Sequence, residues 1–307
     1  MAKTKKVNGL KSRGLHIIVI VGPTATGKSV LAVHLAKKFS GEIISADSRQ
    51  IYRGLDIGTE KITEKEMGGI LHHLLSIADP KHRYTVTDFK HDATEAVRYI
   101  VQKGKLPIVV GGTGFYIQAL VDGIDFPSVP PNPVLRKTLG AKTVDELVRN
   151  LQKLDPARVD TIDVKNRRRL VRAIEIAKAT GQVSPIHSKP NYNALFIGLL
   201  IDRDQLRSRI NKRLVGTLKK GLVEETKKLL DILPHERINE LGLEYRIVTR
   251  FIRDEITEEE TRKLLEYELW HYAKRQMTWF KRDKRILWFN STDTRKIEAA
   301  VRKFLAD

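Results

Sequence analysis

Apolar residues in the first two thirds of the chain form short runs that alternate with segments of helical spacing. The runs share branched apolar side chains, and they occupy residues 15–21 (LHIIVIV), 42–45, 106–110 and 194–201. Such runs are typical of strands buried on both faces of a parallel sheet. Residues 29–39 and 91–102 instead place apolar side chains three and four apart, as amphipathic helices do. The alternation predicts an α/β fold with a doubly wound parallel sheet.

The pattern changes between residues 122 and 193, where no buried-strand run occurs. Prolines cluster at the start and the end of this segment, and leucines at helical spacing lie between them. We therefore predict a helical domain, residues 122–193, inserted into a core made of residues 15–121 and 194–307. After Ile201 the rest of the chain is predicted to be helical, including a long helix that opens with a capping box at residues 257–260.

The charge balance is strongly basic, because 56 Lys and Arg residues against 37 Asp and Glu residues give a formal net charge of +19. Such an excess favours an anionic partner, either a nucleic acid or an acidic membrane surface, over a surface that is merely charged for solubility. No apolar run is long enough to span a membrane, and the one that follows the basic start is too short for a signal peptide. Residues 1–14 are predicted to be a flexible basic arm.

The sequence contains no cysteine. This excludes disulfides, thiolate nucleophiles and cysteine-ligated zinc, and it is compatible with a reducing compartment. We expect a cytoplasmic protein.

Residues 22–29 (GPTATGKS) fit the pattern G-x-x-x-x-G-K-[ST] completely, directly after a predicted strand and at the start of a predicted helix. In such a loop the backbone N–H groups converge on phosphate oxygens, while the helix dipole and Lys28 add positive potential. The hydroxyl of Ser29 is a candidate Mg²⁺ ligand. The predicted diphosphate- or nucleotide-binding residues are Gly22, Pro23, Thr24, Ala25, Thr26, Gly27, Lys28 and Ser29. The loop indicates a polyphosphate, but not the group that the polyphosphate carries.

Two aspartates follow predicted strands and are candidates for chemistry at the same sheet edge. Asp202 precedes a helical segment, so we interpret it as a helix N-cap. Asp47 ends the run EIISAD and faces the edge where ligands bind in open α/β sheets, which favours a functional role.

Seven sequence blocks, in order along the chain, resemble tRNA dimethylallyltransferases, also called tRNA isopentenyltransferases. The blocks are residues 22–29, 44–52 (ISADSRQIY), 55–59 (LDIGT), 72–74 with 79–80, 111–116 (GGTGFY), 168–169 with 172–175, and 272–280 (YAKRQMTWF). The likeness runs from Leu15 to about Phe289. Because eukaryotic members often carry a zinc finger that a chain without cysteine cannot form, the resemblance is to the bacterial type.

The resemblance implies transfer of the dimethylallyl group from dimethylallyl diphosphate to N6 of the adenosine 3′-adjacent to the anticodon, with release of diphosphate and assistance from Mg²⁺. Asp47 would accept the proton from the weakly nucleophilic amino group. The loop amides and Lys28 would stabilise the leaving diphosphate, and Thr24 would hydrogen-bond the leaving oxygen. Thr113 matches the position that contacts the target nucleotide, which would be flipped out. The catalytic residues implied are Asp47, Thr24 and Lys28.

Family members commonly place an arginine near the reaction centre in the helix after Gly221, where this chain has Lys227. His72 and His73 are adjacent, so in an extended segment their side chains point to opposite faces, which argues against a metal site.

Two basic clusters are candidates for RNA contact. One lies in the predicted insertion and comprises Lys165, Arg167, Arg168, Arg169 and Arg172. The other is predicted to occupy one face of the C-terminal helix through His271, Lys274, Arg275, Thr278, Lys281, Arg282 and Arg285, opposite an apolar face with Leu265, Leu269, Ala273, Gln276 and Phe280. Side chains of this kind neutralise phosphates and position an RNA without reading its sequence. Trp279, Phe280, Trp288 and Phe289 are interpreted as core. The candidate tRNA-binding residues are Asp47, Ser48, Arg49, Gln50, Thr113, Arg136, Arg168, Arg169, Arg172, Lys274 and Arg275. The expected partner is the anticodon stem-loop of a tRNA. We expect the protein to be a monomer and not to bind a membrane.

Two other functions fit the phosphate loop. A small-molecule kinase would use Asp47 as the base for an acceptor hydroxyl. A non-catalytic RNA-binding protein would use the loop as a nucleotide switch.

Overall fold

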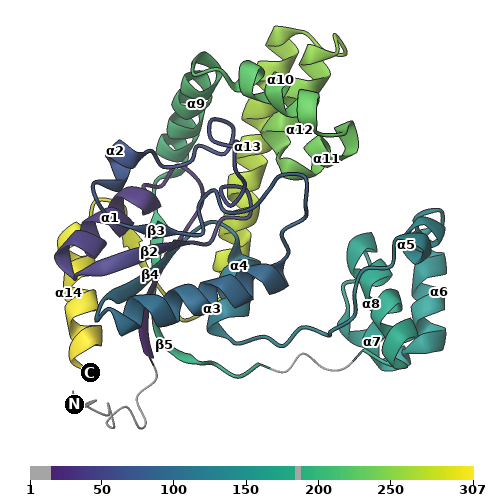
Figure 1. The fold of residues 1–307 in the computed structure, drawn as a ribbon, viewed down its shortest axis with the longest axis horizontal. Coiled ribbons are helices and arrows are strands. Elements are labelled where there is room, and N and C mark those ends of the chain that lie inside the picture. Colours follow the sequence, from purple (N-terminus) through teal and green to yellow (C-terminus); the bar gives the residue numbers. More distant parts are fainter. Residues whose placement is uncertain (1–14, 184–187) are drawn as a thin grey trace, which may run out of the picture. The chain divides into compact units, whose positions relative to one another are not determined.

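The computed structural model describes residues 15–183 and 188–307, so the predicted arm at residues 1–14 lies outside the described residues. The described chain forms two compact units (Figure 1). One unit ends its first part at Gly123 and resumes at Pro190, and the other is Ile124–Lys189. No helix of the described residues is both long and apolar enough to cross a membrane.

The first unit is built on a six-stranded sheet with the order β3-β2-β4-β1-β5-β6. All its neighbouring strands pair in parallel. The strands are β1 (Leu15–Val21), β2 (Gly41–Ser45), β3 (His72–His73), β4 (Leu106–Val110), β5 (Tyr192–Leu200) and β6 (Ile286–Asn290). Because the strands run in one direction, the loops that follow β1, β2 and β4 meet at one edge of the sheet, which is where ligands bind in such folds.

Helices cover both faces of this sheet (Figure 1), as a doubly wound fold requires. Alternate residues of β1 point to opposite faces: Ile18 and Ile20 pack with α1 (Lys28–Lys38) and α14 (Thr294–Ala306). Ile17 and Val19 pack in the second core, with α3 (Val86–Gln102) and α4 (Gly114–Val121). Residues 17–21 of β1 are buried, which explains the uninterrupted apolar run of the sequence.

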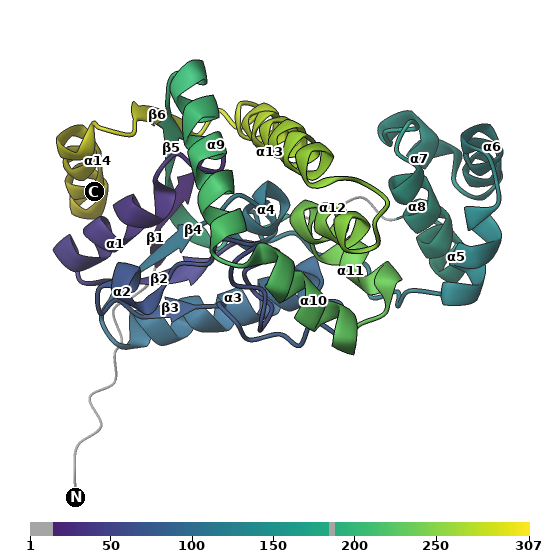
Figure 2. The ribbon, with the colours of Figure 1, turned by 90° about the horizontal axis from the view of Figure 1, so that it is seen from above.

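Five helices lie between β5 and β6 in the chain, and they pack beside the loops at the carboxyl edge of the sheet (Figures 1 and 2). They are α9 (Arg203–Lys219), α10 (Leu222–Ile232), α11 (His235–Leu241), α12 (Leu243–Ile252) and α13 (Glu258–Phe280). The capping box is present, because the Thr257 side chain accepts from the backbone N–H of Glu260 and the Glu260 side chain accepts from that of Thr257. Asp202 caps α9 by accepting from the N–H groups of Asp204 and Gln205, as expected. The short α2 is Glu64–Met67.

Two expectations for the C-terminal part are wrong. The chain after Ile201 is not entirely helical, because residues 286–290 form the edge strand β6. The long helix ends at Phe280, so Lys281, Arg282 and Arg285 lie beyond the helical face to which they were assigned. The aromatic interpretation fares better: Phe280 is buried, and Trp288 and Phe289 pack against the cores on opposite faces of the sheet.

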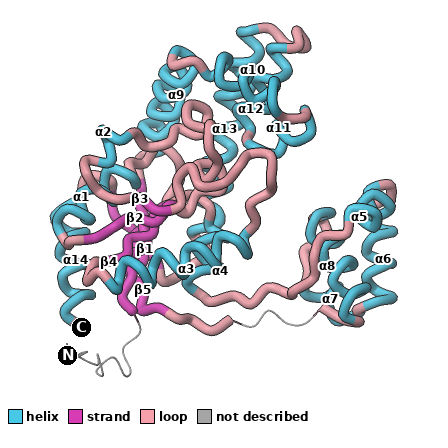
Figure 3. Tube along the Cα trace, viewed as in Figure 1, coloured by secondary structure: helices cyan, strands magenta, loops and turns pink. Residues whose placement is uncertain are grey.

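All regular elements among the described residues of the second unit are helices (Figure 3). They are α5 (Pro133–Gly140), α6 (Val144–Leu154), α7 (Pro156–Thr161) and α8 (Arg167–Thr180). Leu147, Leu151, Leu170 and Ile174 are fully buried and form a core of their own. This unit therefore buries its apolar side chains independently of the sheet.

Candidate active site

The phosphate loop begins at Gly22, whose backbone has a φ of +140°. A Cβ at this position would lie 2.9 Å from the carbonyl oxygen of Leu199 on β5, so glycine is needed both for the turn and for the close approach. Gly27, with a φ of +91°, caps α1, and the N–H groups of the first turn of that helix face the loop. The carbonyl of Pro23 accepts hydrogen bonds from the hydroxyl of Thr26 at 2.9 Å and from the ammonium of Lys28 at 2.7 Å.

Lys28 is the positive charge of this loop, and its protonation is weakened in the protein alone. Burial and the nearby Arg213 lower the pKa of Lys28 to about 7, while Asp47 acts in the opposite direction. Bound phosphate oxygens would restore the charged form. Lys28 and Asp47 therefore share one electrostatic environment, as expected for two residues at one site.

Asp47 follows β2 and is half-buried. Its Oδ1 accepts hydrogen bonds from the backbone N–H groups of Arg49 at 2.9 Å and Gln50 at 3.3 Å. These bonds fix the carboxylate and leave Oδ2 without a hydrogen-bond partner among the described residues. One oxygen is thus anchored, and the other is available to accept a proton.

The loop after β4 lies against the loop after β2. Gly111 packs so closely that a Cβ there would lie 2.1 Å from the carbonyl oxygen of Ala46, which excludes every other residue type. Thr113 accepts a hydrogen bond of 3.0 Å from the N–H of Ser48, and its own N–H donates to the Ala46 carbonyl at 3.2 Å. Thr113 and Asp47 are thereby held on adjacent loops.

Gln276 of α13 joins the phosphate loop to the loop after β4. Its Oε1 accepts a 2.9 Å hydrogen bond from the N–H of Thr24, and its Nε2 donates a 3.1 Å hydrogen bond to the carbonyl of Gly112. A Cβ on Gly112 would lie 2.0 Å from that Nε2. Sequence reasoning placed Gln276 on the apolar side of the helix, and its buried position agrees with that, but its polar role was missed.

Arg213 of α9 is the second functional residue that sequence reasoning missed. Its Nη1 donates a 3.0 Å hydrogen bond to the hydroxyl oxygen of Thr24, and its guanidinium also pairs with the carboxylate of Glu60. Lys227, the residue expected near the reaction centre, is instead exposed on α10. The cation that contacts the phosphate loop is Arg213, from the preceding helix.

Two further titratable side chains, both half-buried, interact electrostatically with Asp47. Burial, followed by the negative charge of Glu60, raises the pKa of Glu244 to about 7, although Arg49 opposes this. Burial, with Asp47 and Glu244, also raises the pKa of Tyr272. At neutral pH Tyr272 is therefore uncharged, and Glu244 is partly protonated.

The predicted RNA-contacting side chains of the sheet unit differ in what they do in the protein alone. Arg49 donates to the backbone carbonyl of Glu240, and Gln50 donates to the carbonyls of Thr59 at 3.1 Å and Glu60 at 3.4 Å. Both side chains therefore also support loops. Lys274 and Arg275 are exposed on α13, and Arg275 lies 3.8 Å from a carboxylate oxygen of Glu268.

In the second unit, Arg136 and Arg172 converge on one buried carboxylate, Glu175. Arg136 forms a two-pronged contact of 3.0 and 2.8 Å with Glu175, and Arg172 bonds both Glu175 and, at 2.7 Å, the carbonyl of Val129. Burial alone would raise the pKa of Glu175, but hydrogen bonds from Arg136, the Asn132 N–H and Arg172 lower it to about 2. These two arginines hold the unit together.

Arg168 and Arg169 lie at the start of α8 and are exposed. Unlike Arg136 and Arg172, they are not part of the contact with Glu175. Their charges are therefore accessible in the protein alone.

A cavity of about 520 Å³ lies between the end of β1 and the end of α13. Apolar and basic side chains line it together, including Ile117, Phe196, Trp279, Arg282 and Lys284. The ring of Trp279 occupies the space that a Cβ of Gly114 would need, at 2.2 Å. Gly114, the residue after Thr113, also lines the cavity, which therefore adjoins that loop.

A metal at this site would have few protein ligands. Ser29 is exposed in the first turn of α1, and no group of three acidic or histidine side chains suited to a metal occurs among the described residues. His73 Nε2 donates a 2.7 Å hydrogen bond to the carboxylate of Glu42, in a pair at the sheet edge. One hydroxyl beside a phosphate loop fits a cation that takes most of its ligands from phosphate oxygens and water.

Comparison with known proteins gives one consistent family. A family model described as IPP transferase matches residues 50–283, and one described as isopentenyl transferase matches residues 15–78. The chain is 39% identical to the tRNA dimethylallyltransferase of Carboxydothermus hydrogenoformans, over 94% of this chain and 99% of that protein. It is 41% identical to the one of Pediococcus pentosaceus, over 93% and 94%.

Solved structures agree. The full-length tRNA isopentenylpyrophosphate transferase of Bacillus halodurans matches with a TM-score of 0.71 and 37% identity, over 96% of each chain. A eukaryotic dimethylallyltransferase acting on tRNA matches with a TM-score of 0.76 and 28% identity, over 91% of this chain and 74% of that one. The α/β sheet with its phosphate loop, the extent of these matches and their shared names lead to one conclusion: the chain belongs to the tRNA dimethylallyltransferase family.

Proposed function

We propose that the protein transfers a dimethylallyl group from dimethylallyl diphosphate to N6 of the adenosine 3′-adjacent to the anticodon of a tRNA. The observation that carries this proposal is a phosphate loop in which Arg213 holds the Thr24 hydroxyl and Lys28 interacts electrostatically with Asp47, whose Oδ2 has no hydrogen-bond partner among the described residues. One group suits a departing diphosphate, and the other suits the proton that an adenine amino group must lose.

Bond cleavage in the donor is assisted by positive charge. As the C1–O bond of the donor breaks, its electron pair goes to the diphosphate, which gains negative charge. The loop amides, Lys28 and Arg213 stabilise that charge because they are in place before the reaction begins. Since Arg213 already donates to Thr24 Oγ1, the hydroxyl hydrogen of Thr24 is free to point to the leaving oxygen.

Bond formation at the acceptor needs a base. As N6 of adenosine bonds to C1 of the prenyl group, its amino group loses one proton, and Asp47 Oδ2 accepts it. Thr113, held to Ser48 one loop away, would orient the target nucleotide. The target adenine would have to leave the base stack, because a stacked base cannot bring its N6 between the phosphate loop and Asp47.

Mg²⁺ would be held by Ser29 and by the diphosphate oxygens. When bound, the metal would neutralise part of the charge of the leaving group. Lys28 and Arg213 supply the corresponding charge from the protein.

The tRNA would be held largely through its phosphates. Arg168 and Arg169 of the inserted unit and Lys274 and Arg275 of α13 are exposed cations suited to that role. We propose that the enzyme acts as a monomer in the cytoplasm, where its tRNA substrate is available.

A direct assay tests the proposal. Purified protein is incubated with Mg²⁺, unmodified tRNA and radiolabelled dimethylallyl diphosphate, and the digested tRNA is examined for prenylated adenosine. Transfer of label from the prenyl diphosphate, with no requirement for ATP, is expected. Consumption of ATP without prenyl transfer would instead support a kinase, and RNA binding without turnover would support a nucleotide switch; the family relationship favours neither.

A further inference from the structure

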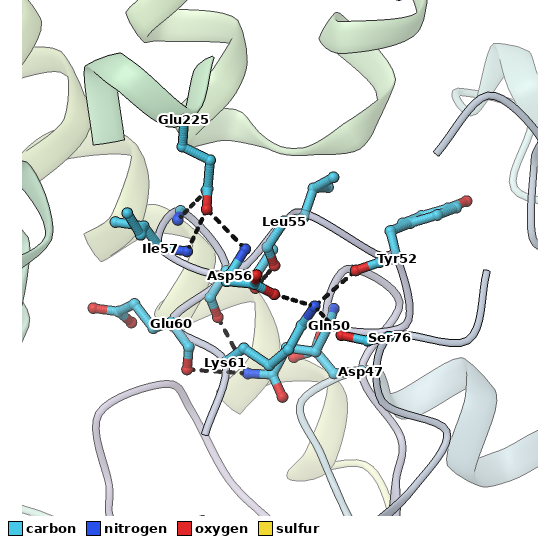
Figure 4. A network of polar contacts seen from close by, with 12 residues as sticks. Asp47, Gln50, Tyr52, Leu55, Asp56, Ile57, Glu60, Lys61, Ser76 and Glu225 are labelled. Carbon is cyan, nitrogen blue, oxygen red and sulfur yellow. Dashed lines mark hydrogen bonds and ion pairs between the residues drawn. The ribbon is translucent and has the colours of Figure 1, made fainter. Parts of the chain in front are cut away.

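Glu225 is a buried carboxylate in the first turn of α10, far from any of the predicted site residues in sequence. Its Oε2 accepts from the N–H groups of Asp56 at 3.0 Å and Ile57 at 2.8 Å, and its Oε1 accepts from the N–H of Gly58 at 2.9 Å (Figure 4). Three consecutive amides that converge on one anion form a backbone nest. Here a side chain of the protein occupies that nest.

Two neighbours complete the arrangement. The hydroxyl of the fully buried Tyr245 donates to Glu225 Oε1 at 2.7 Å, so the carboxylate accepts four hydrogen bonds. A Cβ on Gly58 would lie 2.6 Å from Cζ of the Tyr245 ring. Glycine is therefore required for the loop to come close enough to Glu225.

Lys61, at the end of the same loop, stabilises it through a second set of hydrogen bonds. The ammonium of Lys61 donates to the carbonyl of Tyr52, the carboxylate of Asp56 and the hydroxyl of Ser76, at 2.6–2.7 Å (Figure 4). The hydroxyl of Thr59 closes the turn on the carbonyl of Leu55. Residues 55–61, which we call the clamp loop, thus depend for their shape on one anion and one cation.

The clamp loop is connected by hydrogen bonds and an ion pair both to Asp47 and to Thr24. Its carbonyls at Thr59 and Glu60 accept from Gln50, whose own N–H holds Asp47. The carboxylate of Glu60 pairs with Arg213, which holds the hydroxyl of Thr24.

We propose that Glu225 is a positioning residue for prenyl transfer: it holds the clamp loop so that Glu60 aims Arg213 at Thr24. This inference rests on the proposed function. Glu225 touches no reacting atom, and it acts through the loop. Because a displacement of about 1 Å at a reacting group costs up to about 100-fold in rate, loosening the loop should slow transfer without removing any group from the site.

The first test uses no activity. Glu225→Gln keeps the size of the side chain, but it replaces one acceptor oxygen by an NH₂ donor that faces N–H groups. Glu224→Gln is the matched control, because Glu224 is the adjacent carboxylate on the same helix and is exposed. Hydrogen exchange of the amides of residues 56–58 should accelerate at least tenfold in Glu225→Gln and remain unchanged in Glu224→Gln. Unchanged protection in Glu225→Gln would overturn the proposal.

The second test asks whether Glu225 acts through Arg213. Binding of inorganic diphosphate and the rate of single-turnover prenyl transfer are measured for Glu225→Gln, Arg213→Gln and the double variant. Each single change should reduce both quantities about tenfold or more, and Glu225→Gln should add little once Arg213 is gone, since contacting residues of one network are not additive. Losses that multiply would show that Glu225 acts by another route and would overturn the proposal.

Glu60→Gln provides an independent arm that leaves α10 unchanged. It removes the charge that faces Arg213, so it should reproduce the loss of diphosphate affinity even if Glu225→Gln fails to fold. Full diphosphate affinity in Glu60→Gln would overturn the proposal. If the wild-type protein binds diphosphate in this Arg213-dependent way and yet transfers no prenyl group, the proposed function fails while the positioning role of Glu225 is still decided by exchange and binding.

Discussion

Arg213 and Thr24 are 189 positions apart in sequence and are joined by a 3.0 Å hydrogen bond from the guanidinium to the hydroxyl oxygen. The direction of this bond matters, because arginine can only donate. Thr24 must therefore use its single hydrogen elsewhere, and a diphosphate bound in the phosphate loop would offer an oxygen as the acceptor. A cation and a hydroxyl are thus presented together to the diphosphate.

Replacing Arg213 by glutamine should lower the turnover number about 10²- to 10³-fold, the usual effect of removing one preorganised donor from a developing charge. Affinity for tRNA should not change. Lys212→Gln is the control, because it removes the same charge from the adjacent, exposed position of α9. Steady-state kinetics with saturating tRNA measures the effect. An equal loss of turnover number in the two variants would show that Arg213 acts only through its contribution to the net charge.

Replacing Asp47 by asparagine should lower turnover about 10²- to 10⁴-fold, because the amide oxygen still accepts from Arg49 and Gln50 while the base is lost. Single-turnover transfer at saturating tRNA, with filter binding of the same tRNA, measures rate and affinity separately. Near-normal transfer combined with weak tRNA binding would make Asp47 a recognition residue.

Diphosphate binding should be accompanied by proton uptake by Lys28 above pH 7. The pKa of Lys28 is about 7 in the free protein, and a bound anion raises it, so affinity should fall as the pH rises from about 7. Isothermal titration of inorganic diphosphate at pH 8, in two buffers of different ionisation enthalpy, counts the protons. Lys28→Arg stays charged and should take up about one proton fewer; equal proton numbers would contradict the assignment.

Arg168 and Arg169 are expected to bind RNA phosphates. Replacing both by glutamine should weaken tRNA binding and flatten the plot of log affinity against log salt by about 0.7 units for each contact made to a single-stranded segment. Filter binding at several salt concentrations measures the slope, and diphosphate affinity serves as the control. An unaltered slope would mean that these arginines only solubilise the helix.

Glu175 should stabilise the inserted unit at neutral pH and not in acid. The pKa of Glu175 is lowered to about 2, so its contribution is complete above the ordinary pKa of 4.5 and is lost as the pH falls toward 2. Glu175→Gln leaves Arg136 and Arg172 facing a neutral group, and we expect a loss of about 3–5 kcal/mol in unfolding free energy. Limited proteolysis within residues 124–189 measures the loss; cleavage no faster than in the wild type would contradict the expectation.

The inner strands of the sheet could be predicted, because strands buried on both faces have uninterrupted apolar sequences. Strands β1 and β4 lie inside the sheet with both faces covered, so their apolar runs are uninterrupted. Strand β6 was missed because it is an edge strand of five residues in which Ile286 is buried and Leu287 exposed, directly after a basic stretch. Such a run resembles the end of a helix as much as a strand.

The site divides in the same way. The phosphate loop and Asp47 lie at strand ends, so local pattern was enough to find them. Arg213, Gln276 and Glu225 act through hydrogen bonds that span 164 to 252 residues, and nothing next to them in sequence distinguishes them from ordinary helix residues. Their one available signal was an unexplained polar side chain on an otherwise apolar helix face, which Gln276 shows.

The bridge made by Gln276 has a consequence for how the protein matures on the ribosome. The phosphate loop is translated near the start of the chain, but the side chain that ties its Thr24 to Gly112 arrives only when α13 is synthesised. A nascent or prematurely terminated chain therefore carries the phosphate-binding sequence without the finished site. Only nearly complete chains can have the two loops joined by the Gln276 side chain.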